Sequence, residues 1–323
     1  MKISVLIPAC NSSKTIARTL AAVFAQTLQP EEILVMDDGS TDDTVAVLKP
    51  YLSHITLIQE RNGGVARARN ILVQQARGDF LAFLDHDDIW HPEYLAEQQK
   101  SFATYPEAMG FFASHHNFYG FGDYDWSAEA AGGDSGHEVI VPLDFLRQYH
   151  RAIGKFASMS FFCVPRKVIG RLGGEPFSPE VTGVDDFYFF HRLMLLGPVV
   201  FNTRILVAYR IADGSQSASL LKSVQKAVQS MKLLEVSFQQ QPDTRLKRAF
   251  NVAHSVQRRE YGRVLMGVGQ CREARKQLWI SLIHCHQPVS WMKSLVWLAL
   301  TRIPRRWQPK WPSEWKTAHI QPV

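Results

Sequence analysis

The stretch Phe80-Leu81-Ala82-Phe83-Leu84-Asp85-His86-Asp87-Asp88 carries the strongest indication of the fold. Its first five residues form a continuous apolar run, typical of a strand buried on both faces, and three carboxylates follow within four residues. So much negative charge at an open strand end needs a positive partner, and Mg²⁺ binds through one or two carboxylates plus a substrate phosphate. The alternative is a helix N-cap, in which Asp87 or Asp88 caps a helix beginning near His91-Pro92.

The same arrangement occurs twice nearer the N-terminus. Ile3-Ser4-Val5-Leu6-Ile7 leads into Pro8-Ala9-Cys10-Asn11, and Ile33-Leu34-Val35-Met36 leads into Asp37-Asp38-Gly39-Ser40. Segments with helical spacing separate the apolar runs, so the alternation predicts an α/β fold with a mainly parallel sheet covered on both faces. Ligands of such sheets bind beyond the carboxyl ends of the strands. We therefore expect the three polar turns to meet at one edge.

Charge divides the chain into two parts. Residues 220–323 hold 18 of the 36 Lys and Arg but only 5 of the 30 Asp and Glu. The preceding part is therefore acidic and suited to cations, whereas the last part suits anionic surfaces. Helical spacing also replaces strand patterns from about Leu220. We predict a sheet domain over 1–218 and a basic helical extension over 219–323.

The four cysteines, Cys10, Cys163, Cys271 and Cys285, are scattered, with no Cys-x-x-Cys pair and no secretory signal. A reduced, cytoplasmic setting is expected. His284-Cys285-His286 has the residue types of a soft-metal site. Because the sequence shows no second ligand cluster to accompany it, a surface or packing role is favoured there.

The extension has two recognisable parts. Residues 246–286 predict an antiparallel helical pair. Residues 289–300 are apolar, contain two tryptophans and are too short to span a bilayer. The basic residues that follow them suggest that 289–310 lies on an anionic membrane surface; packing on the sheet domain is the equal alternative. No nucleic-acid recognition module is visible, so nucleic-acid binding is not expected.

Four segments together resemble family 2 glycosyltransferases, which are inverting nucleotide-sugar transferases of the GT-A fold. The segments are Ile3 to Asn11, Val35 to Asp42, Asn62-Gly63-Gly64 with Ala68-Arg69-Asn70, and Ala76-Arg77-Gly78-Asp79 through Asp85-His86-Asp87-Asp88-Ile89-Trp90. The likeness is strong over 1–105 and looser to about 218. It implies a GT-A catalytic domain over 1–218, with a donor half to about 105 and an acceptor half beyond.

The resemblance implies a binding site for a nucleotide-diphosphate sugar, such as a UDP-sugar, and for Mn²⁺ or Mg²⁺. Asp38 would contact the base, while Asp85 and Asp87 would meet the ribose and the metal on the diphosphate. A structural alternative for Asp38 is an Asx turn supporting Gly39. The residues assigned to the donor and metal are Pro8, Ala9, Asn11, Asp38, Gly64, Arg69, Asp85 and Asp87. Gly64 stands in a turn before a helix, where cradling a phosphate and an ordinary turn are equally good explanations.

The resemblance also implies a catalytic base. An acidic pair, Asp185-Asp186, precedes Arg192-Leu193 on one expected helix, and the second carboxylate, Asp186, would take the proton of the acceptor hydroxyl. The first position is more often Glu in the family. The alternative is that both carboxylates only favour the positive end of the helix dipole.

The segment from Tyr209 to Ser215 resembles the part of the family that closes the donor site. Arg210 matches the pattern, but Ala212 stands where a His is common. Asp213 or Ser215 would be the substitutes.

These features predict an inverting, metal-assisted glycosyltransferase that acts on a saccharide or lipid-linked acceptor. The expected setting is surface polysaccharide, lipopolysaccharide or glycolipid assembly, in the cytoplasm or peripherally on the inner face of the membrane. Two alternatives are a nucleotidyltransferase on a similar sheet and a non-catalytic protein that docks a partner through its helical part.

Overall fold

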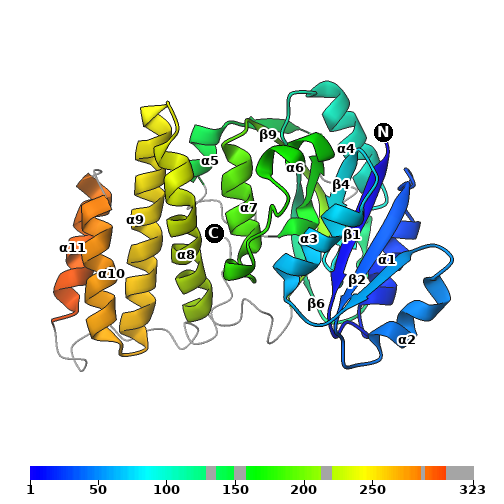
Figure 1. Ribbon diagram of the computed structural model, residues 1–323, viewed down its shortest axis with the longest axis horizontal. Helices are drawn as coiled ribbons and strands as arrows, with labels where there is room; N and C mark the ends of the chain where they lie inside the picture. The colour runs from blue at the N-terminus through cyan, green and yellow to red at the C-terminus, as the bar shows by residue number, and fades with distance from the viewer. Residues whose placement is uncertain (129–135, 149–157, 212–219, 285–287, 303–323) are drawn as a thin grey trace. The chain divides into compact units, whose positions relative to one another are not determined.

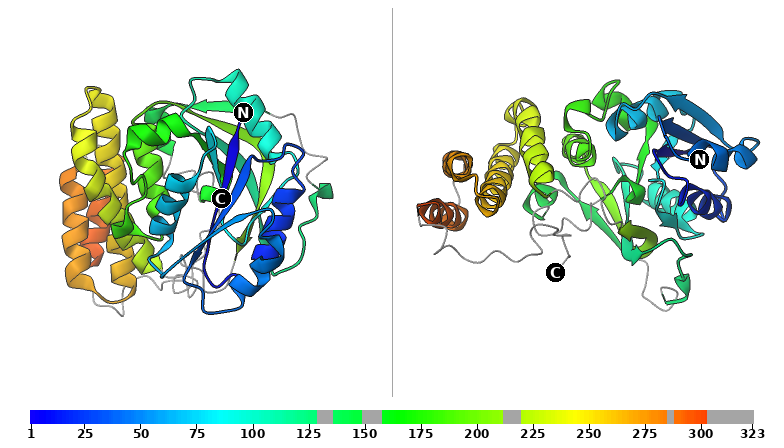
Figure 2. Two further views of the ribbon diagram at one scale, coloured as in Figure 1. Left: turned by 45° about the vertical axis from the view of Figure 1, so that its right-hand side comes forward. Right: turned by 90° about the horizontal axis from the view of Figure 1, so that it is seen from below.

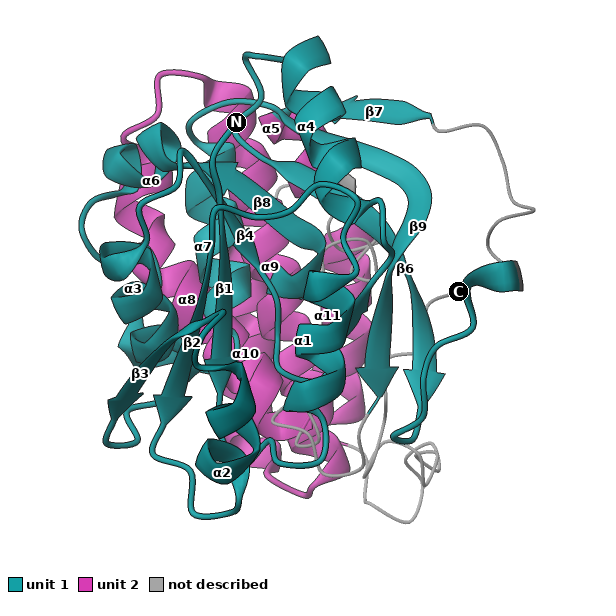
Figure 3. Ribbon diagram, turned by 90° about the vertical axis from the view of Figure 1, so that its right-hand side faces the viewer, with its two compact units in different colours: residues 1–141, 154–212 teal, residues 142–153, 213–323 magenta. Residues whose placement is uncertain are grey.

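The structure, a computed structural model, describes residues 1–128, 136–148, 158–211, 220–284 and 288–302 (Figures 1 and 2). Contacts within the chain define two compact units (Figure 3). Unit 1 comprises residues 1–141 and 154–212, and unit 2 comprises residues 142–153 and 213–323. The predicted boundary at 218 falls outside the described residues.

Unit 1 is built on a nine-stranded sheet with the order β3-β2-β1-β4-β8-β6-β9-β5, in which β7 also pairs with β9. The strands are β1 (Ile3–Ala9), β2 (Glu32–Asp38), β3 (Thr56–Glu60), β4 (Phe80–Phe83), β5 (Ile89–Trp90), β6 (Phe111–Tyr119), β7 (His137–Ile140), β8 (Phe162–Pro165) and β9 (Val199–Ile211). Strands β1 to β4 pair in parallel, as predicted. The second half of the sheet is mixed, because β8 is antiparallel to β4 and β6, whereas β6 and β9 are parallel.

Helices cover both faces of this sheet. They are α1 (Ile16–Phe24), α2 (Thr44–Leu48), α3 (Val65–Gln75), α4 (Tyr94–Thr104), α6 (Arg166–Leu172) and α7 (Asp185–Met194). Every residue of β1 is buried, which explains why its sequence is apolar without alternation. Helix α1 buries Ile16, Leu20 and Val23, the spacing of one helical face.

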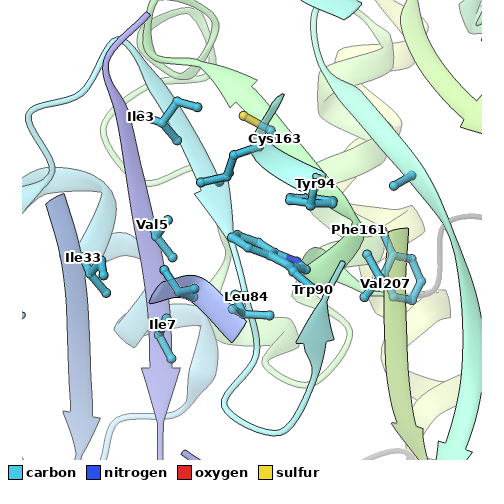
Figure 4. Close-up of a cluster of buried hydrophobic side chains, with 14 of the residues drawn as sticks. Ile3, Val5, Ile7, Ile33, Leu84, Trp90, Tyr94, Phe161, Cys163 and Val207 are labelled. Carbon is cyan, nitrogen blue, oxygen red and sulfur yellow. The ribbon is translucent and has the colours of Figure 1, made fainter. Parts of the chain in front are cut away.

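One core cluster forms around Trp90 (Figure 4). It joins Val5 and Ile7 of β1 to Tyr94 of α4. The Trp90 and Tyr94 rings stack with centroids 4.2 Å apart, and Trp90 Nε1 donates to the Ser160 carbonyl oxygen over 2.8 Å. Burying a large apolar side chain contributes roughly 1.5–3 kcal/mol. Trp90 thereby holds β5 in place, and with it the end of the turn that carries Asp85 to Asp88.

A second cluster is aromatic and connects the end of β4 to α7. Phe83 of β4 makes edge contacts with Phe177 and Phe189, and these two rings stack at 4.7 Å. All three side chains are fully buried. This packing places the first turn of α7 beside the end of β4.

Unit 2 is helical. Helices α8 (Leu220–Gln239), α9 (Thr244–Gly267), α10 (Cys271–His284) and α11 (Pro288–Leu300) lie alongside one another, and α5 (Pro142–Gln148) contacts α9 (Figures 1 and 2). The predicted antiparallel pair is confirmed as α9 and α10. Across the described ranges, we find no helix with the length and apolarity needed to cross a membrane.

Candidate active site

Strands β1, β2 and β4 are parallel and end at the same edge of the sheet, as the sequence predicts. Hydrogen bonds tie the first two turns together. The Asn11 N–H donates to Ser40 Oγ over 2.9 Å, and Asn11 Oδ1 accepts the Thr41 N–H over 2.8 Å. Asn11 has φ of +50°, a left-handed conformation that Asn tolerates better than most residues. Asn11 therefore fixes the shape of this edge.

The Asp38 carboxylate organises the next turn. Its two oxygens accept the Gly63 and Gly64 N–H groups over 2.7 and 2.9 Å. The Asx contact, to the Ser40 N–H over 3.2 Å, belongs instead to Asp37. The Gly64 N–H is thus already bound within the protein.

An open cavity of about 630 Å³ lies beside these turns. It is lined by Asp37, Gly39, Ser40, Gln59, Glu60, Arg61 and Asn62. Gly39 is required here because its φ is +68° and a Cβ on it would lie 2.6 Å from the Asn62 nitrogen. Pro8 and Ala9 are the last two residues of β1 and are buried, with Ala9 paired to Asp37.

Arg69, on α3, joins the two predicted acidic motifs. Its guanidinium lies 2.6 Å from Asp85 Oδ1 and 2.6 Å from Asp185 Oδ2. The second Asp85 oxygen accepts the Ser158 hydroxyl over 3.1 Å, and the Asp85 N–H donates to Ser160 Oγ over 2.8 Å. The two carboxylates raise the pKa of the Arg69 guanidinium even though burial acts to lower it. Arg69 is therefore charged.

Arg210, on β9, holds the other half of the acidic turn. Its guanidinium lies 2.7 Å from Asp87 Oδ2, and its backbone N–H donates to Asp88 Oδ1 over 2.8 Å. Asp88 is fully buried and its Oδ2 has no hydrogen-bond partner among the described residues. Burial, together with the charges of Asp87 and Asp85, raises the pKa of Asp88 well above its usual value.

Asp186 lies in the first turn of α7, next to Asp185. Desolvation, followed by the charge of Asp185, raises the pKa of the Asp186 carboxyl to about 7. Arg192 bonds the carbonyl oxygens of Leu172, Glu175 and Pro176, so it fixes the segment before α7 rather than the acidic pair. The pair does lie at the positive end of the helix dipole, but Asp185 is also bound by Arg69.

The structure corrects one reading of the acidic turn. Neither Asp87 nor Asp88 caps a helix, because β5 follows the turn and α4 begins at Tyr94. Ser158 and Ser160, which bond Asp85, were not singled out from the sequence because isolated serines carry no motif. Asp213 and Ser215, the suggested substitutes at the closing segment, lie outside the described residues.

The adjacent histidines His115 and His116 differ in environment. The His115 ring stacks on Phe161 at 4.2 Å, and burial lowers its pKa to about 4. His116 is exposed and makes an edge contact with Tyr124. Neither residue touches the acidic cluster in the contacts found among the described residues.

The edge thus gathers more negative than positive charge. Five carboxylates, Asp85, Asp87, Asp88, Asp185 and Asp186, meet the two guanidinium groups of Arg69 and Arg210. Burial, followed by the charges of the neighbouring carboxylates, raises the pKa values of Asp88 and Asp186. Carboxylate oxygens are the ligand type that hard divalent cations take in proteins.

Comparison with known proteins identifies the family. The model of glycosyl transferase family 2 matches residues 4–171, which is more than half of the chain. The chain belongs to this family. The resemblance inferred from the four sequence segments is thereby confirmed.

Among relatives in the family, the succinoglycan biosynthesis protein ExoW of Rhizobium meliloti is 32% identical over 183 residues, which cover 53% of this chain and 57% of ExoW. The poly(ribitol-phosphate) beta-N-acetylglucosaminyltransferase TarS of Staphylococcus aureus is 32% identical over 123 residues, which cover 36% of this chain and 20% of TarS. The chain thus spans little more than half of ExoW and a fifth of TarS.

Solved glycosyltransferase structures share the fold. The S. aureus TarS fragment 1–349 in complex with UDP superposes with a TM-score of 0.65 at 17% identity, covering 93% of this chain and 90% of that chain. The mannosyltransferase PcManGT of Pyrobaculum calidifontis, in complex with GDP-Man and Mn²⁺, gives 0.60 at 18% identity and covers 93% and 84%. The predicted GT-A fold with a helical C-terminal part is confirmed.

Proposed function

We propose that this chain is an inverting glycosyltransferase that moves a sugar from a nucleotide-diphosphate donor to an acceptor hydroxyl. One observation carries the proposal: Arg69 joins Asp85 of the acidic turn to Asp185 of the acidic pair, although 100 residues separate them in sequence. Donor-binding and proton-accepting groups then belong to one cluster. Membership of the family supports the reaction type.

The cluster fits a divalent cation. The buried Asp88 Oδ2 has no partner among the described residues, and Asp87 bonds Arg210 through Oδ2 only. We assign Asp87, with Asp85, as the residues that would hold Mn²⁺ or Mg²⁺. Both oxygens of Asp85 already accept bonds from Arg69 and Ser158, so Asp87 is the stronger ligand candidate. The bound ion would neutralise charge that develops on the departing diphosphate.

Asp186 is assigned as the general base. A base is most effective when its pKa lies near the working pH, and the pKa of Asp186 is about 7. As the acceptor oxygen bonds the anomeric carbon, the bond from that carbon to the diphosphate breaks and the hydroxyl proton passes to Asp186. Attack from the face opposite the leaving group inverts the configuration. Arg69 holds Asp185 and thereby keeps the start of α7 at the sheet edge.

The remaining assignments concern the donor nucleoside and the acceptor. We assign Pro8, Ala9, Asn11 and Asp38 to the nucleoside of the donor. Gly64, which directly precedes α3, and Arg69 on α3 complete the donor assignment. We propose a UDP-sugar as the first donor to test, because a TarS fragment was solved in complex with UDP. A saccharide or lipid-linked acceptor in surface polysaccharide assembly is supported by the names of ExoW and TarS.

Helix α11 supports a peripheral membrane location on the cytoplasmic side. Two small serines of α11 are buried: Arg259 donates to Ser290 Oγ over 2.7 Å, and Ser281 Oγ lies 2.8 Å from Ser294 Oγ. Trp297, Leu298 and Leu300 pack against the buried cluster of unit 2, but other apolar side chains of α11 are exposed. The exposed ones are Val289, Trp291, Met292 and Val296. An apolar outer face beside Lys293 matches an interfacial helix on anionic lipid.

The test is a donor panel, UDP-, GDP- and dTDP-sugars, in which release of nucleoside diphosphate is followed with and without Mn²⁺. The proposal expects diphosphate release from one donor class, dependent on a divalent ion and on an added saccharide acceptor. A nucleotidyltransferase would instead consume nucleoside triphosphates and release pyrophosphate. That result, or no turnover of any sugar donor with wild-type protein, would refute the proposal.

A further inference from the structure

Three helices of unit 2 bring together Glu235 of α8, His254 of α9 and His284 of α10. One potential ligand atom of each lies within 4.8 Å of the other two. His254 is fully buried, and Glu235 and His284 are half-buried. Figure 2 shows the three helices packed side by side. All three residues belong to unit 2, and none of them is assigned a part in the proposed transfer reaction.

His254 is the key member. Its Nε2 accepts the Arg258 Nε–H over 3.1 Å, while its Nδ1 is buried and has no hydrogen-bond partner among the described residues. Buried polar atoms are rarely left unpaired, so a missing ion is one of the standard explanations. The rings of His254 and His284 have centroids 4.9 Å apart. Two imidazoles and a carboxylate therefore converge at a buried position.

We propose that Glu235, His254 and His284 bind a zinc ion. Two histidines and one glutamate are a known zinc ligand set, in which water takes the fourth position. Bonds of about 2.0–2.1 Å put ligand atoms roughly 3.4 Å apart in a tetrahedron. The observed 4.8 Å limit leaves at most about 1.4 Å to close, which small side-chain rotations supply.

The charged groups around the cluster affect its affinity for a cation. Burial, followed by the charge of Arg258, lowers the pKa of His254 to about 3, so its ring is neutral, as a metal ligand must be. Lys232 and Arg258 oppose a dication, and Glu235 offsets part of that charge. If the ion takes Nε2, the Arg258 bond to His254 breaks, and Arg258 keeps its bond to Gln277 Oε1 at 2.9 Å.

The bound ion would fasten three helices to one another. The sequence favours a surface or packing role for His284-Cys285-His286, because it shows no second ligand cluster. The packing of the helices supplies the missing ligands. It brings Glu235 and His254, which lie 49 and 30 residues before His284 in sequence, close to His284. Nitrogen ligands favour zinc, whereas the all-oxygen cluster of unit 1 favours Mn²⁺ or Mg²⁺. The two sites are therefore distinguishable by metal type.

The test uses Co²⁺ as a spectroscopic substitute for zinc in the full chain. A four-coordinate site with nitrogen ligands gives intense visible absorption, whereas an octahedral oxygen site absorbs weakly. We expect intense bands at one equivalent, displaced by zinc, and lost in Glu235→Gln, His254→Asn and His284→Asn. The matched controls His54→Asn in unit 1 and Glu273→Gln on α10 should keep the bands. Zinc should raise the melting temperature of wild type and of the controls only.

Three results would overturn the proposal. They are no intense bands in wild type, bands that persist in His284→Asn and Glu235→Gln, or bands that disappear in Asp87→Ala, which would place the ion in unit 1. If circular dichroism shows that His254→Asn does not fold, the two half-buried ligand variants decide the outcome.

Discussion

Arg69 and Asp185 form a buried ion pair across 2.6 Å, although 116 residues separate them in sequence. The exposed fractions of the Arg69 and Asp185 side chains are only 6% and 1%, respectively. The same guanidinium binds Asp85, so a single cation connects α3, the acidic turn after β4 and the start of α7. The acidic pair depends on Arg69 for its place at the sheet edge.

Replacing Arg69 tests this dependence. Arg69→Met leaves two carboxylates without their cation, and breaking a buried pair costs about 3–5 kcal/mol. Arg67→Met is the matched control on the same helix, because Arg67 and its partner Glu60 are exposed and such pairs contribute under about 1 kcal/mol. Thermal unfolding should show a large decrease for Arg69→Met only. Equal melting temperatures for both variants would contradict the role of Arg69.

Asp186→Asn should separate activity from stability. Loss of a general base lowers turnover by about 10²–10⁴-fold. The folded-state pKa of Asp186, about 7, lies above the ordinary 3.8, so the ionised carboxylate destabilises the fold. We expect the variant to be more stable than wild type above pH 7, with a difference that shrinks as the pH falls from 7 toward 3.8. A variant that is less stable at pH 8 would disprove the electrostatic account.

The pH dependence of catalysis follows from the same residue. Because the base must be deprotonated, kcat/KM should rise about tenfold per pH unit below pH 7 and level off above it. Steady-state kinetics at constant ionic strength measures this profile. A rate that stays constant between about pH 5 and 8 would exclude Asp186 as the base.

Donor affinity should distinguish the two acidic motifs. Asp87→Ala should weaken metal-dependent binding of UDP, since it removes the best ligand candidate, whereas Asp186→Asn should leave the affinity nearly unchanged. Asp79→Ala is a suitable control, because Asp79 is exposed just before β4. Calorimetry with Mn²⁺ present provides the comparison. If all three variants bind UDP like wild type, the assignment of Asp87 is wrong.

The outer face of α11 can be tested with lipid vesicles. Trp291→Glu combined with Met292→Glu adds negative charge to this face and should lower binding to anionic vesicles several-fold. Val236→Glu, at an exposed apolar position on α8, is the control. Co-sedimentation at low and high salt measures the effect. Equal sedimentation of both proteins would rule out membrane binding through α11.

Much of the N-terminal fold is predictable from the sequence. Runs such as Leu6-Ile7 and Leu34-Val35 are continuously apolar because both faces of their strands are buried. This pattern is typical of parallel strands, and these strands are parallel. The strand directions in the second half of the sheet are not predictable in this way, because β8 runs antiparallel between β4 and β6. Its apolar run resembles that of a parallel strand, and no local signal encodes the direction.

The sequence by itself determined the alternating strands and helices, the family and the acidic motifs, because these depend on residues close together in the chain. Only the tertiary structure decided which charged and metal-ligating side chains lie next to one another. Arg69 between Asp85 and Asp185, Arg210 on Asp87, and Glu235 beside two histidines all depend on how distant helices and strands pack. Electrostatic interactions act through space over a few ångströms, and sequence spacing does not report that distance.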